Sequence, residues 1–263
     1  MTVYAELQVT SNYSYLRGAS HPEELVLAAQ ALGHTAVGIA DRNTLAGVAR
    51  AHVAAEKVGI KLAVGSRLVL EDGPDILCYP TDRAAYGRLA RLLTLGKRRA
   101  GKGQCRLALA DLTDSTVFAG SAGQKLLVVP PAHPDAAFAG LLVELRKKIG
   151  KGIYLIANNL YHGDDSHRLT VLAALAAQAR TPLVAANDVH MHTPARRALA
   201  DVLACIREHC TIRQAGFRLA AHAERHLEAD LGDGPPVRRL SRCRGARRRD
   251  RRRLHLQPGG AAL

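Results

Sequence analysis

Residues 35–59 read TAVGIADRNTLAGVARAHVAAEKVG, an apolar run followed by a helical pattern. The run at 35–41 is short and ends in Asp41, as a buried strand does when it leaves the core. The pattern at 44–59 ends at Gly59, a residue that often terminates helices in the left-handed conformation. Because a buried strand and the helix that covers it are the repeating unit of α/β proteins, this stretch predicts the fold class.

The same order of apolar run and amphipathic helix recurs along the chain. We expect strands at 6–10, 35–41, 60–70, 75–80, 125–131, 152–159 and 181–190, and helices at 22–32, 44–59, 82–96, 134–150, 164–180 and 193–210. Ser20 and Thr81 are the expected N-terminal caps of the helices that follow them. The pattern predicts a parallel sheet covered by helices, either open or closed into a barrel.

In both arrangements, functional side chains gather at the carboxyl ends of the strands. Those ends carry Gln8, Thr10, Asp41, Arg67, Asp188 and His190. Asp188 and His190 are two residues apart, so in a strand their side chains would lie on one face. Such a pair can bind a divalent metal or polarise a water, but it can also simply fix a loop by a hydrogen bond. Asp41 could complete a metal site or act as a turn residue.

Positive charge is concentrated near the end of the chain. The 263 residues carry a formal charge of +14, and the stretch 238–253 holds ten Arg against a single acid, Asp250. A basic balance of this kind is typical of nucleic-acid partners. An arginine-rich arm that binds nucleic acid is one reading of 231–263, and a frameshift near 227–234 that leaves an unfolded, out-of-frame tail is the other.

The remaining composition fits a protein of the reducing cytoplasm. Five Cys without a C-x-x-C pair predict incidental thiols rather than disulfides. No apolar run approaches the roughly 18 residues of a membrane span, and the N-terminus lacks the pattern of a secretion signal. We therefore expect a cytoplasmic protein without a membrane partner.

Several longer stretches resemble a known family. YAELQVTSNYSYLRGASHPEEL (4–25), ALGHTAVGIADRNTLAGVARA (31–51) and AANDVHMHTPARRALADVLACIREHCTI (185–212) are similar to the N-terminal PHP (polymerase and histidinol phosphatase) domain of bacterial error-prone DNA polymerases, in polymerase family C. The resemblance runs in order from about residue 4 to about residue 226. It implies a distorted seven-stranded β/α barrel at 1–195, a connection towards a polymerase body at 196–230, and the basic tail at 231–263.

The resemblance also implies where a metal site would lie. PHP domains that bind metal open with His-x-His, and this chain has Gln8 and Thr10 there. Their Asp-His pair corresponds to Asp41 and Arg42, and their next Glu corresponds to Arg67. Their late Asp-x-His is retained as Asp188 and His190. Because the two arginines place positive charge where a cation would sit, we predict a degenerate site that binds no cofactor, with guanidinium groups in place of the metal.

Three functions follow as hypotheses. The first is the PHP fragment of an error-prone, DNA-damage-associated DNA-directed polymerase, whose own nucleotidyl transfer needs Mg²⁺ on a palm domain that this chain lacks. That parent would take DNA and other translesion polymerase subunits as partners, in DNA replication and repair. The second is a free-standing PHP metal-dependent phosphoesterase. The third is a non-enzymatic module that binds nucleic acid through its arginine-rich tail.

Overall fold

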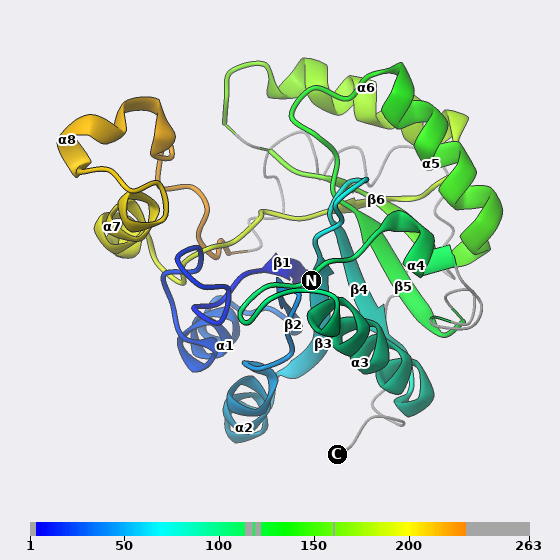
Figure 1. The fold of residues 1–263 in the computed structure, drawn as a ribbon. Helices are drawn as coiled ribbons and strands as arrows, with labels where there is room; N and C mark the ends of the chain where they lie inside the picture. The colour runs from blue at the N-terminus through cyan, green and yellow to red at the C-terminus, as the bar shows by residue number, and fades with distance from the viewer. Residues whose placement is uncertain (1–3, 114–117, 119–121, 160, 230–263) are drawn as a thin grey trace. The chain divides into compact units, whose positions relative to one another are not determined.

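The computed structural model describes residues 4–113, 118, 122–159 and 161–229 (Figure 1). The chain divides into two compact units. The first contains the described residues up to Gly65, the pair 161–162 and the residues from Ala186 onwards, and the second contains Ser66 to Asn159 and Gly163 to Ala185. The basic tail expected at 231–263, with both of its proposed origins, lies outside the described residues.

Seven strands form the sheet, as the sequence predicts. They are β1 (Ala5–Val9), β2 (Ala36–Arg42), β3 (Lys61–Leu68), β4 (Ile76–Pro80), β5 (Gln124–Val128), β6 (Ile153–Ala157) and β7 (Leu183–Ala185), and they are hydrogen-bonded in sequence order. β1 pairs with β2 in parallel, and β5, β6 and β7 are also parallel. The α/β class with a seven-stranded sheet is confirmed.

The direction of β4 differs from the parallel sheet expected from the sequence. β4 runs antiparallel to β3, with Arg67 opposite Leu77, and antiparallel to β5, with Leu77 opposite Leu127. Only residues 69–75 connect β3 to β4. A connection this short cannot carry the chain back to start a parallel strand, which needs a crossover of a dozen or more residues.

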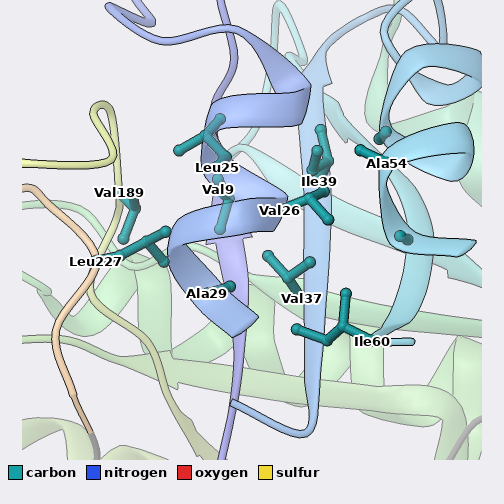
Figure 2. Close-up of a cluster of buried hydrophobic side chains, with 12 residues drawn as sticks. Val9, Leu25, Val26, Ala29, Val37, Ile39, Ala54, Ile60, Val189 and Leu227 are labelled. Atoms are coloured by element: carbon teal, nitrogen blue, oxygen red, sulfur yellow. The ribbon is translucent and has the colours of Figure 1, made fainter. Parts of the chain in front are cut away.

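The first unit is built around β1, β2 and two helices. α1 (Pro22–Ala31) and α2 (Val48–Val58) turn their apolar sides towards these strands. The resulting core contains twelve buried side chains, ten of which are labelled in Figure 2: Val9, Leu25, Val26, Ala29, Val37, Ile39, Ala54, Ile60, Val189 and Leu227. Val189 and Leu227 come from much later in the chain, so this core fixes the segments around both residues.

The later part of the first unit continues with short helices. A 3-10 turn, η3 (Pro194–Arg196), leads into α7 (Arg197–Arg207), which is followed by α8 (Ile212–Ala215) and η4 (Gly216–Arg218). The single helix expected at 193–210 is therefore shorter than predicted: α7 begins at Arg197 and ends at Arg207. On α7, Ala204 and Cys205 are buried, whereas Leu199, Val202 and Ile206 are exposed.

The second unit contains the end of β3, strands β4 to β7 and their helices. These are α3 (Arg83–Arg98), α4 (Leu109–Thr113), α5 (Ala136–Ile149), the 3-10 turn η2 (Gly150–Gly152) and α6 (Asp165–Gln178). Arg168 of α6 is buried and donates to the carbonyl oxygens of Pro131, Ala132 and Asn158, which lie just beyond β5 and β6. No helix among the described residues combines the length and apolar character needed to cross a membrane.

Candidate functional site

The loop after β1 is built to fold back on itself. Gly18 packs so closely that a Cβ atom there would lie 2.1 Å from the carbonyl oxygen of Ser11, which only glycine avoids. Ser14 N–H donates to Ser11 O at 3.0 Å, and Asn12 N–H donates to Ser20 O at 2.9 Å. The compact loop brings the buried hydroxyl groups of Ser11 and Ser14 to the end of β2.

Asp41 lies at that end, and its carboxylate is occupied by hydrogen bonds. Its Oδ1 accepts from Ser11 N at 2.8 Å and from Ser14 Oγ at 2.7 Å, and its Oδ2 accepts from Ser11 Oγ at 2.7 Å. Burial raises the pKa of Asp41 above its usual value, although the hydrogen bonds from the two serines work in the opposite direction. In this setting the carboxylate ties the loop to β2.

Asp188 and His190 come together as the sequence predicts, but not because of strand geometry. β7 ends at Ala185, and Asp188 adopts the left-handed conformation with φ of 49°. The backbone then pairs with β1, where Thr10 N–H donates to Val189 O and Val189 N–H donates to Gln8 O, both at 2.8 Å. Asp188 Oδ1 lies 3.6 Å from His190 Nε2.

A third side chain, Arg225, binds both members of this pair. Its Nη2 forms an ion pair with Asp188 Oδ2 and donates to His190 Nε2 at 2.7 Å. Since Nε2 accepts that bond, the proton of a neutral His190 lies on Nδ1, which is 3.3 Å from the carbonyl oxygen of Arg17. The imidazole atom that would face a metal is thus used by a guanidinium group.

Gln8, where the resemblance implies a lost ligand, also binds Asp188. Its Nε2 donates to Asp188 Oδ1 at 2.8 Å. Its Oε1 is buried without a hydrogen-bond donor among the described residues, so the site keeps one acceptor that a water molecule would suit. Thr10, at the second position that the resemblance implies, is buried and donates its N–H to the carbonyl oxygen of Val189.

Of the two arginines expected to replace ligands, Arg67 binds a carboxylate through its side chain, and Arg42 contributes a backbone hydrogen bond. Arg67 Nε donates to Asp75 Oδ2 at 2.7 Å, an ion pair within the second unit in which both side chains are largely buried. Arg42 N–H donates to Ser14 Oγ at 2.9 Å. The Arg67–Asp75 pair connects β3 to the start of β4 across the hairpin, so this guanidinium supports the antiparallel pairing described above.

Glu6 is a further buried carboxylate in the same unit, and the sequence did not single it out. It accepts from Tyr4 Oη at 2.7 Å, from Gln8 N at 2.8 Å and from Asn187 N at 3.0 Å. Burial raises its pKa, opposed by these three hydrogen bonds. Glu6 joins β1 to the chain just before Asp188 and thereby helps to place that residue.

The residues present do not fit the metal site that the resemblance implies. The single lone pair of His190 Nε2 already accepts a hydrogen bond from Arg225, and both oxygens of Asp188 accept hydrogen bonds from Gln8 and Arg225. A guanidinium group also cannot lose its charge to admit a cation. The arrangement can position loops and neutralise buried carboxylates.

Sequence reasoning found Asp41, Asp188 and His190 but missed the groups that hold them. Ser11 and Ser14 lie in the loop after β1, and nothing in their spacing indicates a carboxylate partner 27 to 30 residues later. Arg225 follows Asp188 by 37 residues, with two helices in between. A search for a basic residue after the last strand could have proposed it, but several arginines compete for that role.

Comparisons with known proteins concern the fold and the family of this chain. A family model described as the PHP domain matches residues 6–177. Error-prone DNA polymerase from Caulobacter vibrioides is 51% identical over 228 residues, covering 86% of this chain and 21% of that protein. Error-prone DNA polymerase from Bradyrhizobium sp. (strain ORS 278) is 50% identical over 236 residues, covering 86% and 20%. The chain thus spans about a fifth of the length of these curated relatives.

Among solved structures, an amidohydrolase from Chromobacterium violaceum has a TM-score of 0.55 at 15% sequence identity, and the match covers 90% of this chain and 96% of that one. At this identity the likeness shows the fold alone. Together with the match of the family model over β1 to α6, it accounts for the seven-stranded α/β architecture. The chain belongs to the PHP domain family.

Proposed function

We propose that this chain is the N-terminal PHP portion of a bacterial error-prone DNA polymerase and that it serves the polymerase as a structural domain. One observation carries the proposal: relatives of that name are about half identical to it along 86% of its length, while it spans only about a fifth of theirs. The parent would act on DNA with Mg²⁺ bound outside this chain, in translesion synthesis and repair within the cytoplasm, where other polymerase subunits could join it.

The remnant metal site supports a structural role. Asp41 accepts hydrogen bonds from Ser11 and Ser14, and Arg225 neutralises Asp188, so each carboxylate already stabilises a loop of the first unit. A phosphoesterase would instead need these oxygens for its metal ions. Hydrogen-bond donors in place of metal ligands would stabilise the fold without metal-dependent catalysis.

The exposed side of α7 supports a place within a larger protein. Leu199, Val202 and Ile206 are 39%, 42% and 53% exposed, and Ile212 of α8 is 55% exposed. Val202, Ile206 and Ile212 line a common groove between the two helices. A contiguous apolar surface of this kind is typical of an interface, and we assign it to contact with the polymerase body.

A chimeric polymerase tests the proposal. Residues 4–229 of this chain would replace the matching N-terminal region of the Caulobacter vibrioides polymerase, which is 51% identical over 228 residues. We expect the chimera to extend a primer at a rate close to that of the parent. A chimera that folds, as judged by circular dichroism, but does not synthesise DNA would contradict the proposed function.

A matched pair of chimeras tests the assigned interface. Ile206→Lys places a charge in the exposed apolar groove, whereas Val53→Lys changes a residue of α2 that is similarly exposed, at 51%. We expect the first substitution to lower primer extension and the second to leave it unchanged. Equal effects would remove the groove as the contact surface.

Metal-dependent hydrolysis remains a second candidate function. It is favoured by the fold shared with the amidohydrolase of Chromobacterium violaceum and by the retained Asp41, Asp188 and His190. We rank it lower, because each of these side chains is bound by the protein itself. An assay of the purified chain for metal-dependent phosphoester hydrolysis separates the two candidates.

A further inference from the structure

We propose that Glu224, His226 and Glu228 form a binding site for a divalent transition-metal ion such as Zn²⁺, separate from the remnant PHP site. Each side chain offers one ligand atom, and these atoms all lie within 4.8 Å of one another. All three residues are partly exposed, so an ion can reach them from solvent. The inference rests on this cluster alone and does not depend on the function proposed above.

The local backbone explains why the three side chains converge. The segment is irregular, with a bend at Arg225, and His226 forms a parallel bridge with Met191. The two residues between the ligands are bound elsewhere: Arg225 binds Asp188, and Leu227 is buried in the apolar core beside Val189 (Figure 2).

Several contacts hold this segment in place. His190 N–H donates to Arg225 O at 2.9 Å, and Met191 N–H donates to the same oxygen at 3.3 Å. The Nε2 atom of His34 lies 2.8 Å from the carbonyl oxygen of Glu228, at the other end of the cluster. With the core position of Leu227 between these anchors, the backbone that carries the three ligands is fixed before any ion binds, which lowers the entropic cost of binding.

The hydrogen bonds around the cluster orient its ligand atoms. His226 Nδ1 lies 3.1 Å from the carbonyl oxygen of Ala223, so a neutral His226 donates from Nδ1 and presents the lone pair of Nε2. A second nitrogen bound to a carbonyl is the usual arrangement of metal-binding histidines. Tyr161 Oη donates to Glu228 Oε1 at 3.3 Å, which leaves Oε2 as a ligand.

The donor set selects the class of ion. One imidazole and two carboxylates suit Zn²⁺, Co²⁺ or Mn²⁺, whereas Mg²⁺ and Ca²⁺ prefer oxygen ligands alone. Three protein ligands leave at least one coordination position for water. The two negatively charged glutamates also attract the cation, and this attraction offsets its repulsion by the neighbouring Arg225.

Titration of the full chain with Co²⁺, a spectroscopic substitute for Zn²⁺, tests the site. We expect visible absorption bands that saturate at one ion per chain, that disappear when Zn²⁺ is added, and that lack the near-ultraviolet thiolate band of cysteine ligation. His226→Ala should weaken this binding by about tenfold or more. Glu224→Gln and Glu228→Gln keep the shape of the side chains and should each weaken it as well.

Matched controls separate this site from others in the chain. His52→Ala removes an exposed histidine whose Nε2 lies 3.4 Å from Glu56 Oε1, its one carboxylate partner among the described residues, and it should leave Co²⁺ binding unchanged. Cys205→Ser should also have no effect. Absence of Co²⁺ binding by the wild-type chain, or binding that survives His226→Ala in a protein with unchanged circular dichroism, would overturn the proposal. Loss on His52→Ala or Cys205→Ser alone would overturn it too.

Discussion

Asp41 shows at the scale of one residue how a side chain can keep its place while its role changes. Three hydrogen-bond donors from Ser11 and Ser14 surround its carboxylate, and it is buried. An asparagine can reproduce most of these bonds, because the serine hydroxyls can rotate to accept as well as donate. An alanine cannot, and it would leave the buried Ser11 N–H without an acceptor.

We predict that Asp41→Ala lowers the free energy of unfolding by about 1–3 kcal/mol, the usual cost of leaving buried polar groups unsatisfied. Asp41→Asn should stay within about 1 kcal/mol of the wild type, because it keeps the bonds from Ser11 and Ser14. Urea unfolding of the three proteins measures both differences. Equal losses in the two variants would show that the charge, and not the hydrogen-bond geometry, is what the fold requires.

The difference in stability between the wild type and Asp41→Asn should depend on pH, and the direction of the pKa shift of Asp41 gives its sign. Burial raises the pKa of Asp41 above the usual 3.8, so the folded state holds its proton more tightly than the unfolded chain does. That contribution is complete below 3.8 and is lost as the pH rises through the folded value. Asp41→Asn should therefore gain stability relative to the wild type as the pH increases. Melting curves at several pH values measure this, and a difference in melting temperature that does not change with pH would contradict the shift.

Arg225 is the residue that most clearly distinguishes this site from a metal centre. We predict that Arg225→Ala lowers the free energy of unfolding by about 1–3 kcal/mol, because Asp188 loses a charged hydrogen-bond partner. In the double variant with Asp188→Asn, the losses should not add, and the coupling should reach about 0.5 kcal/mol or more. Additive losses in denaturant unfolding would mean that the ion pair contributes nothing to the fold.

The candidate residues were predictable from sequence only in part, and for a physical reason. Asp188 and His190 are close in sequence, so their proximity of 3.6 Å was predictable, although the strand geometry expected to produce it is absent. Arg225 and the serines reach their partners through the tertiary fold, which places segments far apart in sequence side by side. Charge and spacing along one chain do not determine such pairs.

At the scale of the elements, helix starts show how sensitive a local pattern is to one residue. Thr81 was the predicted cap of the helix after β4, but the cap is Asp82, whose side chain accepts from Ala85 N at 2.7 Å. Thr81 instead donates to Gly123 O at 2.8 Å. Likewise, α1 is capped by His21 together with Glu24, whereas the predicted cap was Ser20, one residue earlier. Ser20 Oγ lies 2.8 Å from His192 Nδ1, a contact distant in sequence.

We predict that Asp82→Ala destabilises the chain by about 1 kcal/mol, because the first turn of α3 loses the acceptor for Ala85 N–H. Asp82→Asn should be close to neutral, since asparagine caps helices about as well. Thermal unfolding followed by circular dichroism provides the comparison. If alanine and asparagine were equally harmful, the role of Asp82 would lie outside the cap.

The presence and order of strands and helices were predictable because apolar periodicity follows directly from burial. The predicted strand at 35–41 is β2 at Ala36–Arg42, and the predicted helix at 164–180 is α6 at Asp165–Gln178. The direction of β4 was not predictable from periodicity, since a buried strand has the same pattern in either direction. The short connection from β3 contained that information, and it also carries the Arg67–Asp75 pair.

At the scale of the whole molecule, family membership and local chemistry lead to different expectations. The chain belongs to the PHP domain family, and its fold is shared with an amidohydrolase, yet Gln8, Thr10, Arg42 and Arg67 stand where the resemblance implies metal ligands. A fold does not determine an activity, which depends on the groups at the site. In this chain Asp188 and His190 are bound by Gln8 and Arg225, as the proposed structural role requires.

Hydrolysis of a phosphoester by the purified chain tests this central claim most directly. The substrates would be p-nitrophenyl phosphate and a DNA 3′ end, each with Mg²⁺, Mn²⁺ or Zn²⁺, and the matched protein would be Asp188→Asn, which leaves Glu224, His226 and Glu228 intact. We predict no metal-dependent hydrolysis by either protein. Metal-dependent hydrolysis by the wild type that Asp188→Asn abolishes would contradict a structural role and establish the remnant site as a working metal centre.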